Sequence, residues 1–558
     1  MNGFSNFNRE ALFNALTEKQ LDVLVIGGGV TGAGIALDAS SRGLNTGLVE
    51  MQDFAAGTSS RSTKLVHGGL RYLKQFEIKM VAEVGRERAI VYENGPHVTT
   101  PEKMLLPFYK GGTFGSFTTN IGLLMYDFLA GVKKAERRMM LKPKEVLNRE
   151  PLVKEKDLIG GGLYVEYKTD DARLTIEILK KAVQHGTKSV NYAKVIDFLY
   201  EPSTHKLIGA VMEDQITKET YSIYAKKIVN AGGPWVDELR EIDKSKKGKS
   251  LHLTKGVHLV FTNDKFPLDQ AVYFDTPDGR MIFAIPRGDI TYVGTTDTDY
   301  AGNKEQPLMT VSDRDYLLRS IDFMFPSLNL TADDVVSSWA GLRPLIAEED
   351  AANPSEISRK DEIFTSDSGL ISIAGGKLTG YRKMAESVVD TLVKQLKEEE
   401  GILFSASETK YMPLAGGEIG GSERLKAFKK QKIKEAAVLG ISEKDADKMV
   451  QRYGANTDTV LRLFRENQSE AKQEHMDPLV FAELLYALHE EAIYKPADFF
   501  VRRTGALFFE MEWLKAHKES VIQYMAKALN WTKDEKNAYS AELEQLIYHA
   551  IQPAETSS

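Results

Sequence analysis

With 558 residues, the chain is too long for one hydrophobic core, and its length predicts two or three domains. Its net charge of −7 argues against a nucleic-acid-binding protein, and its lack of cysteine excludes disulfides, iron–sulfur clusters and a flavin linked through cysteine. The sequence has no run of about eighteen uncharged apolar residues and no signal-peptide pattern, so we expect a cytoplasmic protein without a membrane-spanning segment.

Residues 22–50 predict a strand, a glycine-rich turn, a helix and a second strand. The run 22–26 is apolar, and the spacing over 30–42 is helical and ends at Gly43. A second apolar run ends at 48–50. This order of elements is typical of the first unit of a nucleotide-binding α/β domain.

The turn itself fits the pattern G-x-G-x-x-G, with Gly27, Gly29 and Gly32 at its fixed positions, and Glu50 follows at the end of the second strand. Such glycines let the backbone approach a pyrophosphate, the helix start attracts its charge, and the acid accepts hydrogen bonds from ribose hydroxyls. The segment therefore predicts a dinucleotide site. FAD is favoured over NAD because the motif occurs once, near the start of the chain, which leaves no evident second site for a separate nicotinamide.

Two later segments repeat the order of a β-rich run, a pair of glycines and a helix start: KKIVNAGGPW (226–235) and GLISIAGGKLTGYR (369–382). Three such junctions predict one nucleotide-binding domain that insertions interrupt. In the last of them, Lys377 beside a helix start could stabilise negative charge near N1 of a flavin. A simple turn with an exposed lysine fits these residues equally well.

The inserted and C-terminal parts have other patterns. Residues 281–299, MIFAIPRGDITYVGTTDTD, predict two antiparallel strands joined at 287–289, and from about residue 405 the periodicity is helical. We therefore expect an α/β protein in three parts. These are an interrupted nucleotide-binding domain over 1–400 with a substrate domain inserted at about 75–190 and 240–345, a linker over 401–421, and a helical domain over 422–558.

Several motifs together resemble one family: GGGVTGAGIALDASSRGL, GTSSRSTKLVHGGLRYL, VNAGGPW, WAGLRPL and IAGGKLTGYR. They look like the FAD-dependent glycerol-3-phosphate dehydrogenases, within the larger group that includes D-amino-acid oxidase, and DFFVRRTGALFF (498–509) is similar to that family's C-terminal helical domain. The resemblance implies a Rossmann-type FAD-binding domain, a substrate domain with an antiparallel sheet and a C-terminal helical cap. It also implies oxidation of sn-glycerol 3-phosphate to dihydroxyacetone phosphate by hydride transfer to FAD, with electrons passing to a quinone.

The resemblance extends to partners and location. It implies peripheral association with the inner face of the cell membrane and allows a homodimer. No D-x-[DN]-x-[DN]-G occurs, so the calcium loops of mitochondrial relatives and any metal are not expected, and without cysteine the FAD is expected to be non-covalent. Residues 114–141 combine an apolar stretch with a basic end, which fits an interfacial segment, although a packed helix is the favoured interpretation.

The stretch RSTKLVHGGLRYL (61–73) is either a solvated basic turn or one wall of the site. A loop that leaves the second strand can return toward the nucleotide crevice. The resemblance implies that Arg71 and Tyr72 face the substrate. It also implies FAD contacts at Thr58, Ser59, Ser62, Thr63, Lys64 and His67 on this loop, and elsewhere at Gly232, Gly376, Thr379 and Val195, the last of which could equally be a buried strand valine.

The implied substrate is a phosphate dianion beside a secondary alcohol, so the site needs cations and a base. The family pattern implicates Arg343, Arg359 and Lys377, and an arginine fork pairs with two phosphate oxygens. His258 is the expected base because a neutral imidazole accepts a proton near pH 7. The alternative is a structural histidine, with Arg343 lowering the pKa of the alcohol while another group takes the proton.

Two other functions stay open. A glycerol-3-phosphate oxidase would share the site and return electrons to oxygen as hydrogen peroxide, but such oxidases tend to carry an extra insertion for which this chain seems too short. A non-catalytic flavin-binding or regulatory protein would not need the cluster of His258, Arg343, Arg359 and Lys377.

Overall fold

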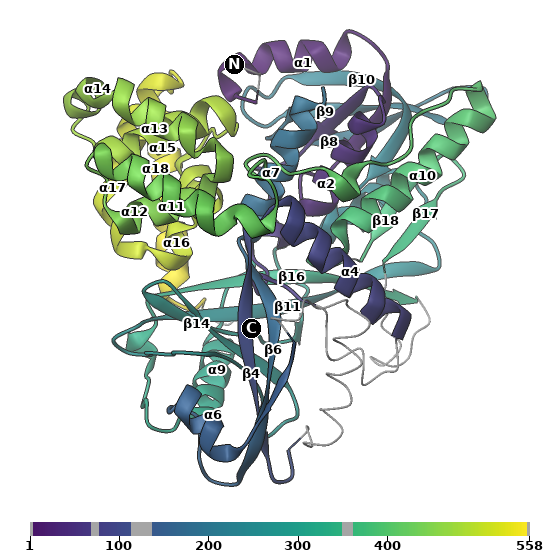
Figure 1. The fold of residues 1–558 in the computed structure, drawn as a ribbon. Coiled ribbons are helices and arrows are strands. Elements are labelled where there is room, and N and C mark those ends of the chain that lie inside the picture. Colours follow the sequence, from purple (N-terminus) through teal and green to yellow (C-terminus); the bar gives the residue numbers. More distant parts are fainter. Residues whose placement is uncertain (1–3, 68–77, 113–136, 349–360, 376, 555–558) are drawn as a thin grey trace.

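The computed structural model describes residues 4–67, 78–112, 137–348, 361–375 and 377–554. The predicted site residues Arg71, Tyr72, Arg359 and Gly376 lie outside the described residues, as does most of the segment 114–141. The described residues form two sheets and a group of C-terminal helices (Figure 1). Among their helices, none is both long and apolar enough to cross a bilayer.

The first sheet has eight strands and carries the glycine-rich turn. Its order is β17-β18-β10-β1-β2-β7, and β8 and β9 extend β10 as an antiparallel ribbon. The neighbours β18, β10, β1, β2 and β7 are parallel, so their carboxyl ends share one edge. The strands are β1 (Leu21–Ile26), β2 (Thr46–Val49), β7 (Lys188–Val190), β8 (Ala193–Tyr200), β9 (Leu207–Asp214), β10 (Thr220–Asn230), β17 (Glu362–Thr365) and β18 (Leu370–Ala374).

Helices pack around the first sheet. The central one, α2, contacts both α7 and α10, which explains why nearly all of its side chains are buried. The strand, helix and strand predicted over 22–50 are confirmed, each within one residue of its expected ends. The helices of this part are α1 (Arg9–Thr17), α2 (Val30–Ser41), α4 (Ile78–Asn94), α7 (Asp171–Gln184), α8 (Val236–Ile242) and α10 (Tyr381–Glu400).

The second sheet has ten strands and is antiparallel except where β12 pairs with β4. Its order is β15-β11-β14-β13-β12-β4-β6-β3, with β16 paired to β11 and β5 to β6. The predicted hairpin is confirmed, since β13 and β14 pair antiparallel on either side of Gly288. The strands are β3 (Leu65–Val66), β4 (Thr99–Tyr109), β5 (Met139–Leu141), β6 (Leu158–Thr169), β11 (Lys249–Thr262), β12 (Ala271–Asp275), β13 (Met281–Arg287), β14 (Ile290–Gly294), β15 (Thr298–Asp299) and β16 (Ser337–Glu348).

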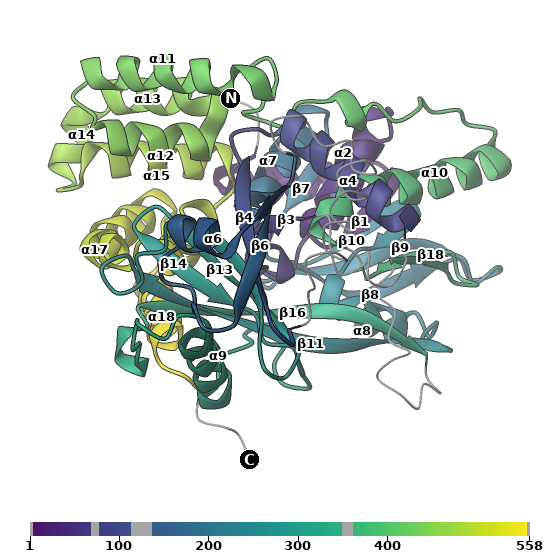
Figure 2. The ribbon, with the colours of Figure 1, turned by 60° about the horizontal axis from the view of Figure 1, so that its bottom comes forward.

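One apolar core lies within the second sheet and its two helices, α6 (Pro143–Arg149) and α9 (Val311–Met324). Another core joins this sheet to the C-terminal helices, because Tyr292 and Trp339 pack in one cluster with Phe500 and Phe508. Figure 2 shows the resulting arrangement, with the C-terminal helices beside both sheets. The helical region therefore packs directly on the second sheet and also on α7 of the first part.

The C-terminal region is helical, as predicted. Within the range expected for the substrate domain, α7 and β7 pack with the first sheet rather than the second. The exact division into domains stays a prediction. The C-terminal helices are α11 (Leu425–Val438), α12 (Glu443–Tyr453), α13 (Thr457–Glu466), α14 (Gln468–Gln473), α15 (Pro478–Glu490), the π-helix η11 (Asp498–Arg503), α16 (Ala506–Phe509), α17 (Met511–Ala528) and α18 (Lys533–Ile551).

Candidate active site

The glycine-rich turn joins β1 to α2 at the carboxyl edge of the first sheet. Gly27 has a φ of +114°, and a Cβ atom there would collide with the carbonyl oxygen of Ala231 at the end of β10. A Cβ atom at Gly32 would collide with the carbonyl oxygen of Gly27. The chain can follow this tight path only with glycine at both positions, and the path leaves the start of α2 open to a ligand.

The start of α2 has the properties of an anion site. Gly29 is its N-cap and offers no capping side chain, while the amide of Val30 donates to Ser59 Oγ at 2.9 Å. The first amides of a helix carry partial positive charge and point toward bound anions. A pyrophosphate group fits this end of the helix, beside the short helix η2 (Thr58–Ser60).

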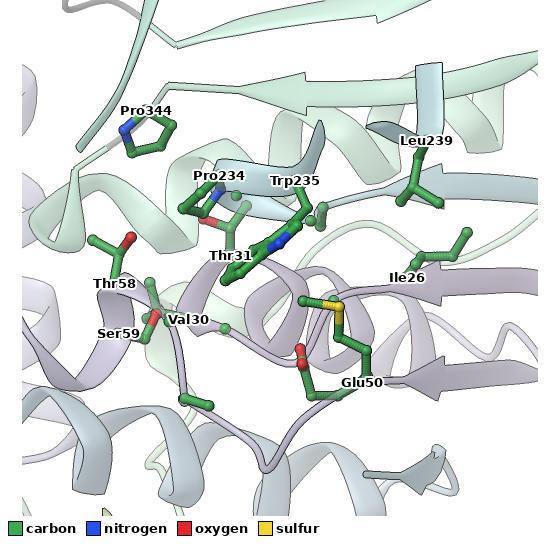
Figure 3. Close-up of a pocket in the computed structure, with 18 of the residues that line it drawn as sticks. Ile26, Val30, Thr31, Glu50, Thr58, Ser59, Pro234, Trp235, Leu239 and Pro344 are labelled. Carbon is green, nitrogen blue, oxygen red and sulfur yellow. Dashed lines mark hydrogen bonds between the residues drawn. The ribbon is translucent and has the colours of Figure 1, made fainter. Parts of the chain in front are cut away.

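A pocket opens at this edge of the sheet (Figure 3). It encloses about 1300 Å³ of empty space, its open mouth included. In Figure 3, Glu50 comes from the end of β2 and Trp235 from the opposite side, while Thr58 and Ser59 lie at one end. The predicted residues that line the pocket are Gly27, Gly29, Glu50, Thr58, Ser59, Ser62, Val195, Gly232 and Lys377.

The remaining described candidates for cofactor contact are not part of this lining. Thr379 Oγ1 donates to the carbonyl oxygen of His67 at 3.1 Å, which ties the loop to the short helix η7 (Leu378–Gly380). Burial lowers the pKa of His67. The candidates that are not part of the pocket lining are Gly32, Thr63, Lys64, His67 and Thr379.

Glu50 holds the backbone of the turn as well as facing the pocket. Its Oε2 accepts from the amide of Gly28 at 2.6 Å, and its Oε1 accepts from the amide of Gln52 at 2.8 Å. Burial raises the pKa of this carboxyl, and the two amide hydrogen bonds oppose that rise. The two amides therefore hold the carboxylate in place at the edge of the pocket.

Sequence reasoning missed one large side chain of the pocket. Trp235 follows the Gly-Gly pair after β10, and its ring lies 3.4 Å from the position that a Cβ atom would take at Gly57. Pro234 beside it lines the pocket too. The signal was present in the motif VNAGGPW, where an aromatic residue stands at the start of a helix on the carboxyl edge of the sheet.

The loop of η2 is attached to strand β16 of the second sheet. Thr58 Oγ1 donates to the carbonyl oxygen of Leu342 at 2.7 Å, and Trp339 Nε1 donates to that of Ser62 at 3.0 Å. Between these bonds, a Cβ atom at Gly341 would collide with the carbonyl oxygen of Arg61. Glycine at this position therefore lets the pocket loop lie directly on the second sheet.

Lys64 is part of this attachment. Its ammonium donates to Asp171 Oδ1 at 2.6 Å and to the carbonyl oxygen of Ser60 at 2.9 Å, and it is 2% exposed. Asp171 Oδ2 accepts from both the amide and the hydroxyl of Ser62. The side chain of Lys64 thus anchors the loop to the start of α7, outside the lining of the pocket.

His258 lies on β11, opposite Trp339 on β16, and the two rings stack with their centres 4.7 Å apart. Its Nε2 lies 3.1 Å from Thr63 Oγ1, and its Nδ1 has no hydrogen-bond partner in the part of the chain that the structure describes. Burial, together with the positive charges of Arg343 and Lys64, lowers its pKa well below the ordinary value. The imidazole is therefore neutral at pH 7.

Arg343 lies on β16, opposite Thr254 of β11, and is partly exposed. Its guanidinium donates to Thr295 Oγ1 at 3.0 Å and forms an ion pair with Asp297 at 3.2 Å. A Cβ atom at Gly256 would collide with this guanidinium, so glycine there gives the arginine room beside the strand that carries His258. The structure thus brings a neutral imidazole and a guanidinium to the same pair of strands.

The described part of the chain contains no group of three or more His, Asp or Glu side chains that could hold a metal ion. Lys377 lines the pocket at the start of η7, just after β18. The arrangement is a nucleotide pocket on one sheet with a histidine and an arginine on the adjoining sheet. A nucleotide pocket on one sheet, next to reactive side chains on another, is typical of α/β enzymes that use a dinucleotide.

Comparisons with known proteins agree with this class. Residues 22–382 match the model of the FAD dependent oxidoreductase family, and residues 407–536 match the C-terminal domain of alpha-glycerophosphate oxidase. The chain belongs to the FAD-dependent oxidoreductases, in the family that includes the aerobic glycerol-3-phosphate dehydrogenases. It is a flavoprotein enzyme, and its cofactor is FAD.

Three relatives illustrate the match. An aerobic glycerol-3-phosphate dehydrogenase of Bacillus subtilis is 60% identical over 99% of both chains, and one of Staphylococcus saprophyticus is 56% identical over 98% of both. The crystal structure of the glycerol-3-phosphate dehydrogenase of Bacillus halodurans, complexed with FAD, has a TM-score of 0.86 at 48% identity and covers all of both chains. The expected family and fold class are confirmed.

Proposed function

We propose that this enzyme oxidises sn-glycerol 3-phosphate to dihydroxyacetone phosphate and passes the electrons to a quinone. The observation that carries the proposal is the 60% identity, over nearly the whole length, to a relative named as an aerobic glycerol-3-phosphate dehydrogenase. Attachment to the inner face of the cell membrane and formation of a homodimer belong to the same proposal. The buried histidine and the arginine on adjacent strands support it chemically.

FAD fits the residues around the pocket. The glycine-rich turn and the start of α2 suit its pyrophosphate, Glu50 suits a ribose, and the backbone at Val195 suits the adenine. Lys377 and the helix start after it suit the flavin end. Bound FAD supplies an acceptor for two electrons and the C2 hydrogen of the substrate. Because the chain has no cysteine, we propose that the flavin is held non-covalently.

Gly32→Ala should weaken FAD binding by at least about ten-fold, because the added methyl group would collide with the carbonyl oxygen of Gly27 and open the turn. Titration of the apoprotein with FAD, followed by flavin fluorescence, measures this affinity. Gly43→Ala is the control for backbone strain alone, since alanine is strained at its φ of +96° but its Cβ atom would meet nothing within 4 Å, and Gly43 lies outside the pocket. It should lower stability and leave FAD affinity unchanged. Equal affinities for Gly32→Ala and the wild type would contradict the assignment of the turn to FAD.

In this proposal, Arg343 binds the phosphate end of the substrate and His258 acts on its C2 hydroxyl. The guanidinium of Arg343 holds the phosphate dianion through two of its N–H groups. His258 Nε2–H donates to Thr63 Oγ1, and this tautomer leaves a lone pair on Nδ1, which takes the proton of the C2 hydroxyl. The surrounding aromatic rings exclude water from the imidazole.

Anaerobic addition of glycerol 3-phosphate tests the function directly. We expect it to bleach the flavin absorbance, and glycerol alone to leave the spectrum unchanged because it lacks the phosphate. A soluble quinone should then restore the colour faster than oxygen does. Persistence of the oxidised spectrum would contradict the proposed substrate, and stoichiometric peroxide at undiminished turnover in air would identify an oxidase instead.

A further inference from the structure

The loop between β2 and η2 forms one side of the pocket and contains a buried acid that does not line it. The pocket is lined on this side by Glu50, Met51 and residues 56–59. Between them lies Asp53, which is 1% exposed and is not part of the lining. A buried carboxylate is costly unless charged or polar partners surround it, so its partners indicate what holds this loop.

The partners of Asp53 come chiefly from the C-terminal helical region, about 450 residues further along the chain. Arg503 makes a two-pronged contact, with Nη1 donating to Oδ2 at 2.8 Å and Nη2 donating to Oδ1 at 2.9 Å. Arg502 Nε donates to Oδ2, and Asn191 Nδ2 donates to Oδ1 at 2.9 Å. Two arginines thus bind one carboxylate, in the geometry that gives the strongest charge-assisted hydrogen bonds.

Both arginines are fixed on their own side. Arg503 also donates to the carbonyl oxygen of Glu491, and Arg502 donates to Asp498, which in turn accepts from the hydroxyl of Tyr192 at 2.6 Å. They are consecutive residues, which do not face the same partner from a regular α-helix. Here they belong to the π-helix η11, a wider turn that is often found at functional positions.

Asp53 is closely linked to the groups that shape the pocket. On one side, the carbonyl oxygen of Gln52 accepts from the amide of Tyr192, and the amide of Gln52 donates to Glu50. On the other side, the amide of Ala55, with a φ of +62°, donates to the carbonyl oxygen of Gly28 at 3.0 Å. A shift of Asp53 would therefore move both the ribose acid and the glycine-rich turn.

The charge on Asp53 does not depend on pH in the physiological range. Burial alone would raise the pKa of its carboxyl, but Arg503 and Arg502 outweigh burial and lower the pKa to about 2. The contact is thus a permanent ion pair, and its strength is set by geometry.

We propose that Arg502 and Arg503 are positioning residues for the FAD site, so that the C-terminal helical region holds the pocket loop through Asp53. The proposal rests on the assignment of this pocket to FAD. It gives the motif DFFVRRTG a role in cofactor affinity beyond joining two parts of the molecule.

A pair of variants tests the proposal. Arg503→Lys keeps the charge but loses the two-pronged contact, and it should weaken FAD binding to the apoprotein by about ten-fold or more. Tyr486→Phe is the matched control, because it removes another buried contact between the C-terminal helices and α7, the 2.6 Å hydrogen bond from Lys180. The control should change the FAD dissociation constant less than about two-fold. Equal losses in both variants, or no loss in Arg503→Lys, would overturn the proposal.

A second measurement needs no variant. Coupling between two sites is reciprocal, so FAD added to the wild-type apoprotein should slow amide hydrogen exchange in η11 as well as in residues 50–59, and leave α18 unchanged. Protection of residues 27–32 and 50–59 without protection of η11 would overturn the role of the arginines alone. FAD binding that protects neither segment would instead overturn the assignment of the pocket.

Discussion

Replacing His258 with alanine should slow reduction of the flavin by about a hundred-fold or more at saturating glycerol 3-phosphate, while leaving substrate affinity nearly unchanged. The reason is that the buried imidazole is neutral at pH 7, since burial and two nearby cations lower its pKa, and so it can accept the hydroxyl proton. Anaerobic stopped-flow absorbance, recorded over a range of substrate concentrations, separates the rate of reduction from the apparent affinity.

His252→Ala is the matched control for this experiment. His252 lies on the same strand, β11, but it is paired with the exposed Asp299 and lies away from Trp339. We expect its flavin to be reduced at the wild-type rate. If His258→Ala also reduced its flavin at that rate, His258 would be a structural residue beside the core that joins the second sheet to the C-terminal helices, and the proton would go to another group.

Arg343→Ala should weaken apparent substrate binding by roughly ten- to a hundred-fold, because one charge-assisted, two-pronged contact with a phosphate contributes about 1.5–3 kcal/mol. The same stopped-flow titration measures this loss as a shift in the substrate concentration that gives half of the maximal rate. The limiting rate should change much less than the affinity.

Arg280→Ala is a suitable control for Arg343→Ala, because Arg280 is an exposed arginine in the turn between β12 and β13 and pairs with Asp278. It should bind substrate normally. If Arg343→Ala instead bound substrate normally but failed to reduce its flavin, the arginine would belong to the hydroxyl end of the substrate and would act on the pKa of the alcohol.

Features decided by neighbouring residues could be predicted from the sequence. The turn at Gly27 and the hairpin at Gly288 depend on glycines within short runs of strand and helix residues, and both are confirmed. The pairing of His258 with Trp339 was not foreseen, because it depends on the register between β11 and β16. Periodicity within one strand carries no information about which residue of another strand lies opposite.

Ion pairs between residues far apart in the chain could not be predicted from the sequence either. The FAD contact of Lys64 stays a prediction, and the sequence did not suggest that its ammonium pairs with Asp171 at the start of α7. The basic motif that contains Arg503 resembled a family feature without suggesting Asp53 as its partner. The sequence around a charged residue does not show whether its side chain is solvated or is buried against an opposite charge from a distant segment. Only the three-dimensional structure distinguishes a solvated charge from a buried ion pair.

The alternation of side chains along β16 gives a substitution and a change of strand length different consequences. Successive residues of a strand face opposite ways, so Arg343 and Pro344 serve different surroundings, the first beside β11 and Thr295, the second at the pocket. Under the proposed assignment, a substitution at position 343 should therefore change substrate binding and leave the side of the strand that lines the pocket at Pro344 intact. Gain or loss of a single residue within β16 would exchange the two faces, so we expect this strand to tolerate a substitution at position 343 better than a change of length.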